Sequence, residues 1–171
     1  AGQRAQTSDG AVSLVLASGA FLRANRDCRS LARIRGVGWS TDSYRLGAQR
    51  LGAMGAARRA FGMALRQADM VDASAIDVFE LEAPTGWHEA ALVRALGVSS
   101  EEALSPSGGC FAQHPHYCTG LVNAVEAVLQ VSGQAGPVQR QGARLAMAHS
   151  GHGYAHQGSV SMIFEWSGEV Q

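Results

Sequence analysis

The amino-acid sequence predicts an α/β fold in which helices pack on a layered sheet. Short apolar runs rich in β-branched residues occur at five places along the 171 residues, and such runs are typical of buried strands. Longer segments with apolar residues at helical spacing lie between them. Hydrophobic residues make up 46% of the chain, so one domain of this length can bury a substantial core. Helices between buried strands favour an α/β layered arrangement.

The five predicted strands are residues 11–18, 31–39, 75–81, 144–153 and 158–166. The first of them reads AVSLVLAS, a short apolar run that indicates a buried strand. In the second, Gly36 and Gly38 permit the close approach of another backbone.

A long helix is predicted over residues 46–70, where apolar side chains recur at helical spacing. Gly47, Gly52 and Gly55 lie in the same segment. Because glycine lowers the stability of a helix, we expect this helix to pack closely against a neighbour.

Two further helices have recognisable boundaries. Thr85 is a predicted N-cap and Gly97 a predicted stop for the helix between them. Another helix is expected to follow residue 120 and to end near Gly133. Its predicted apolar stripe consists of Leu121, Val122, Val125, Val128 and Leu129.

Composition excludes several classes of function. The formal net charge is zero, so no general attraction to nucleic acid or to a membrane is expected. All 14 basic residues are arginine, which excludes Schiff-base catalysis by a lysine of this chain. The three cysteines have no paired spacing, and we expect a reduced, cytoplasmic setting. No apolar run reaches the length of a membrane span.

Reactive side chains gather in residues 108–120, GGCFAQHPHYCTG, directly before a predicted helix. A zinc site would need ligands such as Cys110 and His114, but the spacing C-x3-H-x-H-x-C is not a common zinc pattern. A second interpretation is a glycine-rich turn whose histidines only cap and solvate. Against it, Pro115 fixes the backbone after His114, and a helix N-terminus favours an anion or a developing oxyanion.

Residues 105–136, SPSGGCFAQHPHYCTGLVNAVEAVLQVSGQAG, resemble the thiolase segment N-x-x-G-G-x-x-x-x-G-H-P-x-G-x-T-G with its following helix. Three other segments agree in the same order. They are TSDGAVSLVLAS at 7–18, DVFELEAPTGWHEAALVRALG at 77–97 and LAMAHSGHGYAHQGSVSMIFEW at 145–166. The chain is similar to the C-terminal half of a thiolase, and most similar to the sterol-carrier-protein type thiolases and the thiolase-like aldolases.

The resemblance implies a mixed five-stranded sheet with helices on both faces, within a larger αβαβα assembly. Residues 1–20 would be the last strand of the N-terminal half, and residues 21–171 the C-terminal domain. It also implies an acyl-CoA substrate, no other cofactor, no metal, and a homodimer that could include a small OB-fold partner subunit. The nucleophilic cysteine of the family would come from the N-terminal half. Cys110 and Cys118 are interpreted as small packing residues.

His114 matches the histidine of the family's G-H-P element, which favours a thiolate and hydrogen-bonds a thioester oxygen. Glu82 falls where the family has Asn or His, and an ionised carboxylate cannot donate to an oxyanion. We therefore expect Glu82 to act as a base or acid, or only as a solvated strand-end carboxylate. His88 is a substitute donor and a predicted substrate-binding residue. Glu80, inside an apolar strand, is expected to make a structural hydrogen bond.

His149 falls near the family's second cysteine, which moves a proton at the α-carbon, and an imidazole can do the same near neutral pH. Gly151 and Gly153 would leave their N–H groups free for the thioester oxygen. His152 is an alternative to His149, because the alignment can shift by a few residues. His116 crowds the predicted floor of the substrate pocket. Tyr154 and His156 are expected at the rim.

The sequence thus predicts acyl-CoA carbon–carbon bond cleavage or formation, with His114, His149 and Glu82 as catalytic residues. Two alternatives stay open. One is a retro-aldolase that acts on a branched or steroid-like acyl-CoA, and the other is a non-catalytic lipid-binding or scaffold subunit.

Overall fold

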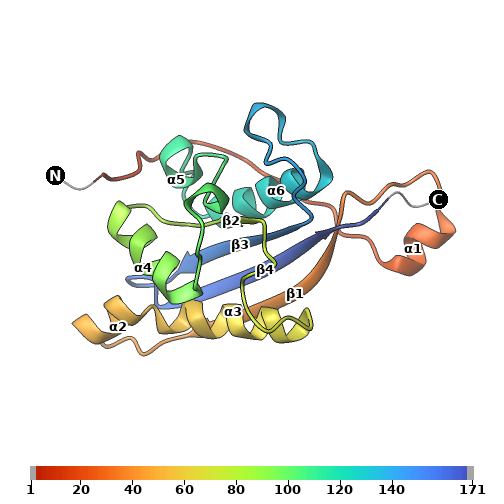
Figure 1. Ribbon diagram of the computed structural model, residues 1–171. Coiled ribbons are helices and arrows are strands. Elements are labelled where there is room, and N and C mark those ends of the chain that lie inside the picture. Colours follow the sequence, from red (N-terminus) through yellow and green to blue (C-terminus); the bar gives the residue numbers. More distant parts are fainter. Residues whose placement is uncertain (1–2, 169–171) are drawn as a thin grey trace.

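The computed structural model describes residues 3–168 and contains one mixed sheet. Its strands, in spatial order, are β1 (Ala32–Thr41), β4 (Gly158–Trp166), β3 (Leu145–His152) and β2 (Val78–Glu80). The pairs β1–β4 and β4–β3 are antiparallel, whereas β3–β2 is parallel. Figure 1 shows the sheet between two layers of helices.

Side chains alternate along the central strands, so each face of the sheet has its own core. Met147 on β3 packs into the cluster formed with α3 (Gly55–Gln67) and α4 (Gly86–Leu96). Its neighbours Ala146 and Ala148 pack into the opposite cluster, against α6 (Thr119–Ser132). This period of two is the geometry of a strand that is buried on both faces. The predicted α/β arrangement with helices on both faces is confirmed.

Close packing between α3 and β1 depends on two glycines. A Cβ atom at Gly36 would collide with the backbone of Ala64, and one at Gly38 with the carbonyl oxygen of Ala60. Ala60 and Ala64 are fully buried. The predicted close approach at these two glycines is therefore confirmed, and it brings the axis of α3 near the sheet.

The predicted strand over residues 11–18 is wrong for the described chain. The segment lies outside the sheet, and Val15 is 93% exposed. An extended segment needs a partner strand to form a ladder, and no described strand lies beside this one. It leads into α1 (Gly19–Ala24). The sheet consequently has four strands rather than five, with Leu104 adding one isolated parallel bridge to Phe79.

The predicted helix over residues 46–70 is broken. It consists of α2 (Ala48–Ala53) and α3, and Met54 between them has a left-handed backbone with φ of 45°. This break turns the buried Met54 side chain inward. The expectation of close packing fails at Gly47 and Gly52, where a Cβ would meet nothing within 4 Å.

Both shorter helices begin and end near the predicted residues. The hydroxyl of Thr85 accepts a hydrogen bond from the N–H of His88 at the start of α4, and Gly97 ends it in the left-handed conformation. Gly133 ends α6 in the same way. The remaining short elements are α5 (Gly109–Ala112) and the 3₁₀ turns η1 (Glu101–Ala103) and η2 (Gly136–Val138).

The buried face of α6 differs from the predicted stripe. The helix turns Asn123, Ala124, Ala127 and Val131 toward the sheet. The predicted apolar residues are only partly covered, and Leu121 is 40% exposed. Small residues face the sheet because they let α6 pack closely, which leaves the larger apolar side chains on its sides.

Candidate active site

His114 lies in the turn that leads into α6. Its Nδ1 is 3.0 Å from the hydroxyl oxygen of Thr119, and this hydroxyl is 2.9 Å from the carbonyl oxygen of Pro115. The carbonyl can only accept, so the hydroxyl donates to Pro115 and accepts from the Nδ1–H of His114. Neutral His114 therefore has an unprotonated Nε2, which can take up a proton.

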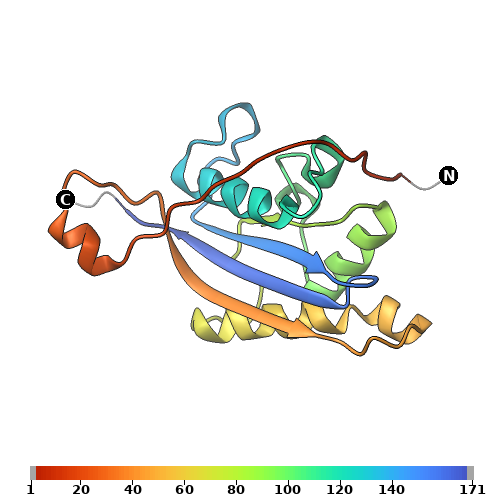
Figure 2. The same cartoon turned by 180° about the vertical axis from the view of Figure 1, so that it is seen from behind.

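The N-terminal segment fastens this turn from outside. The hydroxyl of Ser8 accepts a hydrogen bond of 3.1 Å from the N–H of His114, and the N–H of Ser8 donates 3.2 Å to the carbonyl of His114. Figure 2 shows this segment crossing the side of α6 that faces away from the sheet. A Cβ at Gly10 would press against Pro115, so the segment lies directly on the turn.

His114 opens into a cleft of about 190 Å³ at the carboxyl end of β3. The ring is mostly buried, with 8% of the residue exposed. Burial and the neighbouring His116 ring lower the pKa of His114, so the ring is neutral at pH 7. The cleft is lined by Glu82, Pro84, His114, His116, Tyr117, Gly151, His152, Gly153 and His156.

Glu82 is held at the end of this cleft by β3. One carboxylate oxygen accepts hydrogen bonds from the hydroxyl of Ser150 at 2.9 Å and from the N–H of Gly151 at 3.2 Å. Burial raises the pKa of Glu82, and these two bonds oppose the shift. The carboxyl is thus held in place by hydrogen bonds from β3, rather than solvated at a strand end.

His149 and His152 lie on opposite faces of the hairpin strand because they are three residues apart. His152 lines the cleft with His114. His149 lies on the face of Met147, has 1% of its surface exposed and lines a different pocket. The structure does not bring His149 into the His114 cleft, and it does bring the alternative, His152.

The two predicted glycines have different surroundings. The N–H of Gly151 already donates to Glu82, so it is not free for a thioester oxygen in this arrangement. A Cβ at Gly151 would collide with the ring of His156. Gly153 lines the cleft and has φ of 73°, a conformation that favours glycine.

His116 lines the cleft beside His114, with 4.9 Å between the ring centroids. His88 lies elsewhere, in the second pocket, where its Nδ1 is 2.7 Å from the hydroxyl of Thr85. Burial lowers the pKa of His88. Its ring lies beside that of His156, with 4.4 Å between the ring centroids and 41° between the ring planes.

His156 is more central than its predicted place at the rim. It lines both pockets, and burial, together with His88 and His114, lowers its pKa to about 4. The residues that sequence reasoning missed are Ser150, Ser8 and Thr119. Ser150 could have been found, because the alternation of side chains along the predicted strand at 144–153 puts it on the same face as His152.

No metal site is found among residues 3–168, and none of the three cysteines lines the cleft. No group of three or more His, Cys, Asp or Glu residues there has metal-binding geometry. Cys110 is buried, and burial raises the pKa of its thiol to about 11. Cys118 lies outside the lining of the cleft, with its sulfur near the carbonyls of Gly10 and Pro115.

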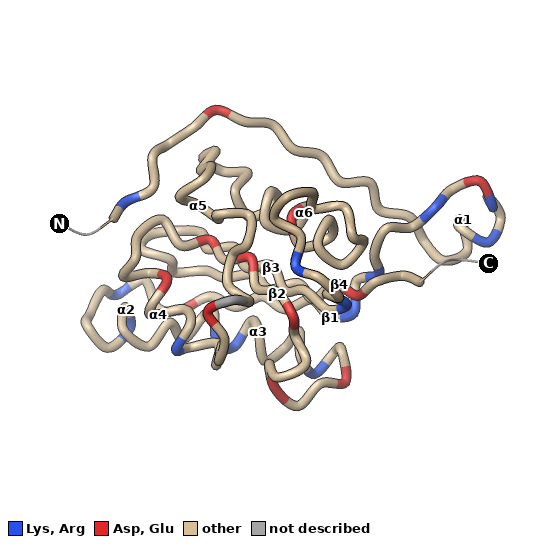
Figure 3. The backbone as a smooth tube through the Cα atoms, turned by 45° about the horizontal axis from the view of Figure 1, so that its top comes forward, with Lys and Arg blue, Asp and Glu red and all other residues tan. Residues whose placement is uncertain are grey.

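Charge and hydropathy of the described chain add two observations. Acidic and basic residues are interspersed along the backbone in Figure 3, consistent with the net charge of zero. In the described part of the chain, no helix is both long and apolar enough to cross a membrane.

The architecture is that of a thiolase-like fold. The chain is similar to human mitochondrial 3-ketoacyl-CoA thiolase in two crystal structures, one of them in complex with CoA, with a TM-score of 0.68 and 19% identity over 88% of this chain and 34% of the thiolase. It is also similar to a monomeric SCP2-thiolase like protein type 1 from Mycobacterium smegmatis, with a TM-score of 0.62 and 19% identity over 78% of this chain and 29% of that protein.

The chain spans about a third of the length of these thiolases. No protein-family model matches the sequence, and no curated protein matches it. The comparisons confirm the predicted fold.

Proposed function

We propose that this chain forms the C-terminal half of a thiolase-like enzyme that cleaves or forms a carbon–carbon bond next to the thioester carbonyl of an acyl-CoA. The observation that carries the proposal is the pair of hydrogen bonds from Nδ1 of His114 to Thr119 and from Thr119 to Pro115, which together leave Nε2 of His114 as the unprotonated nitrogen at an open cleft. A neutral imidazole with a lowered pKa is suited to accept a proton at pH 7.

In this proposal His114 takes the proton of a cysteine thiol that the N-terminal half supplies. In the cleavage direction the thiolate attacks the ketone carbonyl, and the C2–C3 bond breaks with its electron pair left on C2, which takes up a proton. The acyl group on the cysteine then passes to the thiol of CoA; in the direction of bond formation the thiolate attacks a thioester carbonyl and CoA leaves as its thiol. His152 is the residue best placed to exchange the proton of the α-carbon, because it shares the cleft with His114. His149, which the sequence favoured, is separated from the cleft by β3 and would act there only after a rearrangement.

Two surfaces support a missing N-terminal half. The apolar stripe of α6 remains partly exposed, and such a face is normally covered by another layer. Exposure alternates along residues 11–15, and Val15 and Leu16 are open to solvent. This alternation suits the last strand of a second sheet, with residues 1–20 belonging to that half. A homodimer, an OB-fold partner and a cytoplasmic setting remain parts of the proposal.

A retro-aldol reaction is the second candidate, and Glu82 favours it. The carboxylate stands where thiolases have an oxyanion donor, and its pKa is raised by burial. Glu82 or His114 would take the proton of a 3-hydroxyl group while the C2–C3 bond breaks, and the electron pair would pass to C2 as the enolate of the thioester. Protonation of C2 by His152 completes the balance without an acyl-cysteine.

The experiment follows acyl-CoA turnover by the assembly of this chain with its N-terminal half, using 3-ketoacyl-CoA plus CoA in one arm and 3-hydroxyacyl-CoA in the other. His114→Ala is expected to lower kcat about 100-fold or more, in the range of a lost general base. Gln113→Ala, an exposed neighbour, is the matched control and is expected to retain activity. Full activity in His114→Ala would contradict the proposal.

The two arms also separate the reactions. Turnover of only the 3-hydroxyacyl substrate would identify the retro-aldolase. Binding of acyl-CoA with no turnover in either arm would favour the non-catalytic lipid-binding or scaffold subunit.

A further inference from the structure

Glu82 is held in the cleft by only one of its two carboxylate oxygens. Oε2 accepts both hydrogen bonds, from the hydroxyl of Ser150 at 2.9 Å and from the N–H of Gly151 at 3.2 Å. None of the described residues donates a hydrogen bond to Oε1. Both oxygens of a carboxylate can accept, and Glu82 lines the cleft. Oε1 is therefore left for a donor group that enters the cleft.

The start of α6 makes room for the side chain of Ser150. A Cβ atom at Gly120, the second residue of α6, would lie 2.2 Å from Oγ of Ser150 and 3.5 Å from Oε2 of Glu82. Because Gly120 has no side chain, Ser150 fits between the helix and the carboxylate. The carboxylate thus lies beside the first turn of α6, and the N-terminus of a helix favours a negative charge.

Ser150 also has a large effect on the charge of Glu82. Burial raises the pKa of Glu82, and the hydrogen bond from Ser150 is the strongest of the influences that lower it. Weaker influences in the same direction come from the N–H of Gly151 and from the charges of His116 and His152. The remaining titratable groups near the carboxylate are the cleft residues His114 and His156 and the buried thiol of Cys110.

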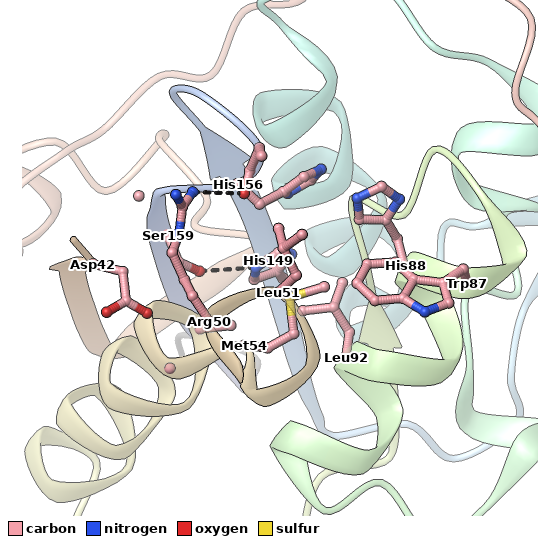
Figure 4. A pocket seen from close by; sticks show the side chains of 14 residues that line it. Asp42, Arg50, Leu51, Met54, Trp87, His88, Leu92, His149, His156 and Ser159 are labelled. Carbon is pink, nitrogen blue, oxygen red and sulfur yellow. Dashed lines mark hydrogen bonds between the residues drawn. The ribbon is translucent and has the colours of Figure 1, made fainter. Parts of the chain in front are cut away.

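A second serine of the β3–β4 hairpin makes a comparable bond on the other face of the sheet. Ser159 lies opposite Gly151 across the two strands, and its hydroxyl is 2.8 Å from Nε2 of His149. Figure 4 shows this pair in the other pocket, which Glu82 does not line. Ser159 is therefore a matched serine whose hydrogen bond does not involve the carboxylate.

We propose that Ser150 is a positioning residue for Glu82, which holds Oε2 and thereby presents Oε1 as the acceptor for the proton of a substrate 3-hydroxyl group. The inference rests on the retro-aldol reaction described above, and it decides between the two bases named there. The 3-hydroxyl proton passes to Oε1, and the electron pair of the O–H bond forms the new carbonyl. The pair of the C2–C3 bond passes to C2, which takes a proton from His152. Exchange with water restores both groups.

The first test follows the ionisation of Glu82 in the purified chain, without substrate. The ¹³C resonance of the Glu82 carboxyl is identified by its loss in Glu82→Gln and is followed against pH. Ser150→Ala is expected to move the midpoint to higher pH by about one unit, because a hydrogen bond to the charged form is lost. Equal midpoints in the native chain and in Ser150→Ala would overturn the inference.

Ser159→Ala is the control for a merely structural effect. It removes a buried hydrogen bond from the same hairpin, so it is expected to lower the free energy of unfolding. It should nevertheless leave the midpoint of Glu82 where it is in the native chain. A midpoint that moves equally in Ser159→Ala and Ser150→Ala would show a general disturbance of the hairpin and would contradict a specific role for Ser150.

The second test uses the assembly with the N-terminal half and 3-hydroxyacyl-CoA. Ser150→Ala is expected to lower kcat at pH 7 about tenfold, because the base is less well oriented and less often ionised. The acidic limb of kcat/KM, which reports groups of the free enzyme, should move to higher pH with the midpoint of Glu82. A lower kcat with an unmoved acidic limb would reduce Ser150 to a structural residue.

Glu82→Gln separates this inference from the proposed function. Undiminished turnover of 3-hydroxyacyl-CoA by Glu82→Gln would assign the proton to His114, and it would overturn the inference while the enzyme remained a retro-aldolase. Absence of turnover by the native assembly with either substrate would instead reject the proposed function. The titration of Glu82 in the purified chain would then still decide whether Ser150 holds the carboxylate.

Discussion

Thr119 and His114 form a pair in which a hydroxyl fixes the tautomer of an imidazole. The hydroxyl of Thr119 is committed to the carbonyl of Pro115 and so accepts from Nδ1–H of His114. Threonine at this position, the first residue of α6, thus decides which nitrogen of His114 can act as a base.

Thr119→Val tests this relationship, because valine keeps the shape and removes the hydroxyl. Nδ1–H of His114 would lose its acceptor in a buried place, and the free energy of unfolding is expected to fall by about 1–3 kcal/mol. The ¹⁵N spectrum of the His114 ring should change from one tautomer to a mixture. Thr119→Ser, which keeps the hydroxyl, is the control and is expected to retain the native spectrum. An unchanged tautomer in Thr119→Val would contradict the assignment.

Gly38→Ala should destabilise the protein because the added Cβ meets the backbone of α3 at Ala60. Overpacking of this kind costs about 1–3 kcal/mol, which urea unfolding will measure. Gly52→Ala is the matched change, since Gly52 lies within α2 with nothing within 4 Å of the new Cβ. It is expected to stabilise the protein by about 0.5–1 kcal/mol. Equal effects of the two changes would contradict the packing of α3 on β1.

Glu80 gives the stability of the protein a defined pH dependence. The fully buried carboxyl accepts a hydrogen bond of 2.6 Å from the hydroxyl of Ser107, so the predicted structural hydrogen bond is present. Burial raises the pKa of Glu80 from 4.5 to about 7. A raised folded-state pKa stabilises the protein below pH 4.5, and this contribution is lost as the pH rises from 4.5 to 7. The loss in the free energy of unfolding over this pH range is on the order of 3 kcal/mol.

Glu80→Gln removes this titration. The variant's free energy of unfolding, measured by urea at pH 5 and pH 8, should depend less on pH than that of the native chain, and the difference between the two proteins should favour the variant at pH 8. The pKa values of His149 and His156 are lowered, to about 3 and about 4, so these two histidines have the opposite effect to Glu80 and lower the stability as the pH falls below 6.5. Their contribution is the same in the native chain and in Glu80→Gln, and it cancels when the two free energies of unfolding are subtracted. Parallel pH profiles would contradict a raised pKa for Glu80.

Local patterns in the sequence predicted the elements whose residues determine their own conformation. Thr85 and Gly97 bound α4 because capping depends on neighbouring residues. Residues 11–18 could not be placed by the same reasoning, since a strand exists only with a partner, and nothing in the composition of AVSLVLAS tells whether one is present. The break at Met54 was equally hidden, because its left-handed backbone is sustained by tertiary packing.

The candidate site could be predicted only in part, because some of its residues depend on contacts that are distant in the sequence. His114 was found from a motif with a mechanism, whereas the choice between His149 and His152 depends on which face of β3 each residue occupies. That choice follows from the contacts of Met147 and Ala148 with opposite helix layers. A one-residue shift along a strand reverses every side chain, so an alignment that was uncertain by a few residues could not decide it.

Thiol reactivity tests whether this chain carries its own nucleophile. Cys28 is exposed, Cys118 is partly exposed, and Cys110 is buried with its pKa raised to about 11. Because the thiolate is the reactive form, iodoacetamide at pH 7.5 should modify Cys28 first and leave Cys110 unmodified in the folded chain, as read by mass spectrometry of peptides. All three should react in urea. Rapid modification of Cys110 in the folded protein would instead indicate a thiolate four residues before His114, and the nucleophile would then not have to come from another half.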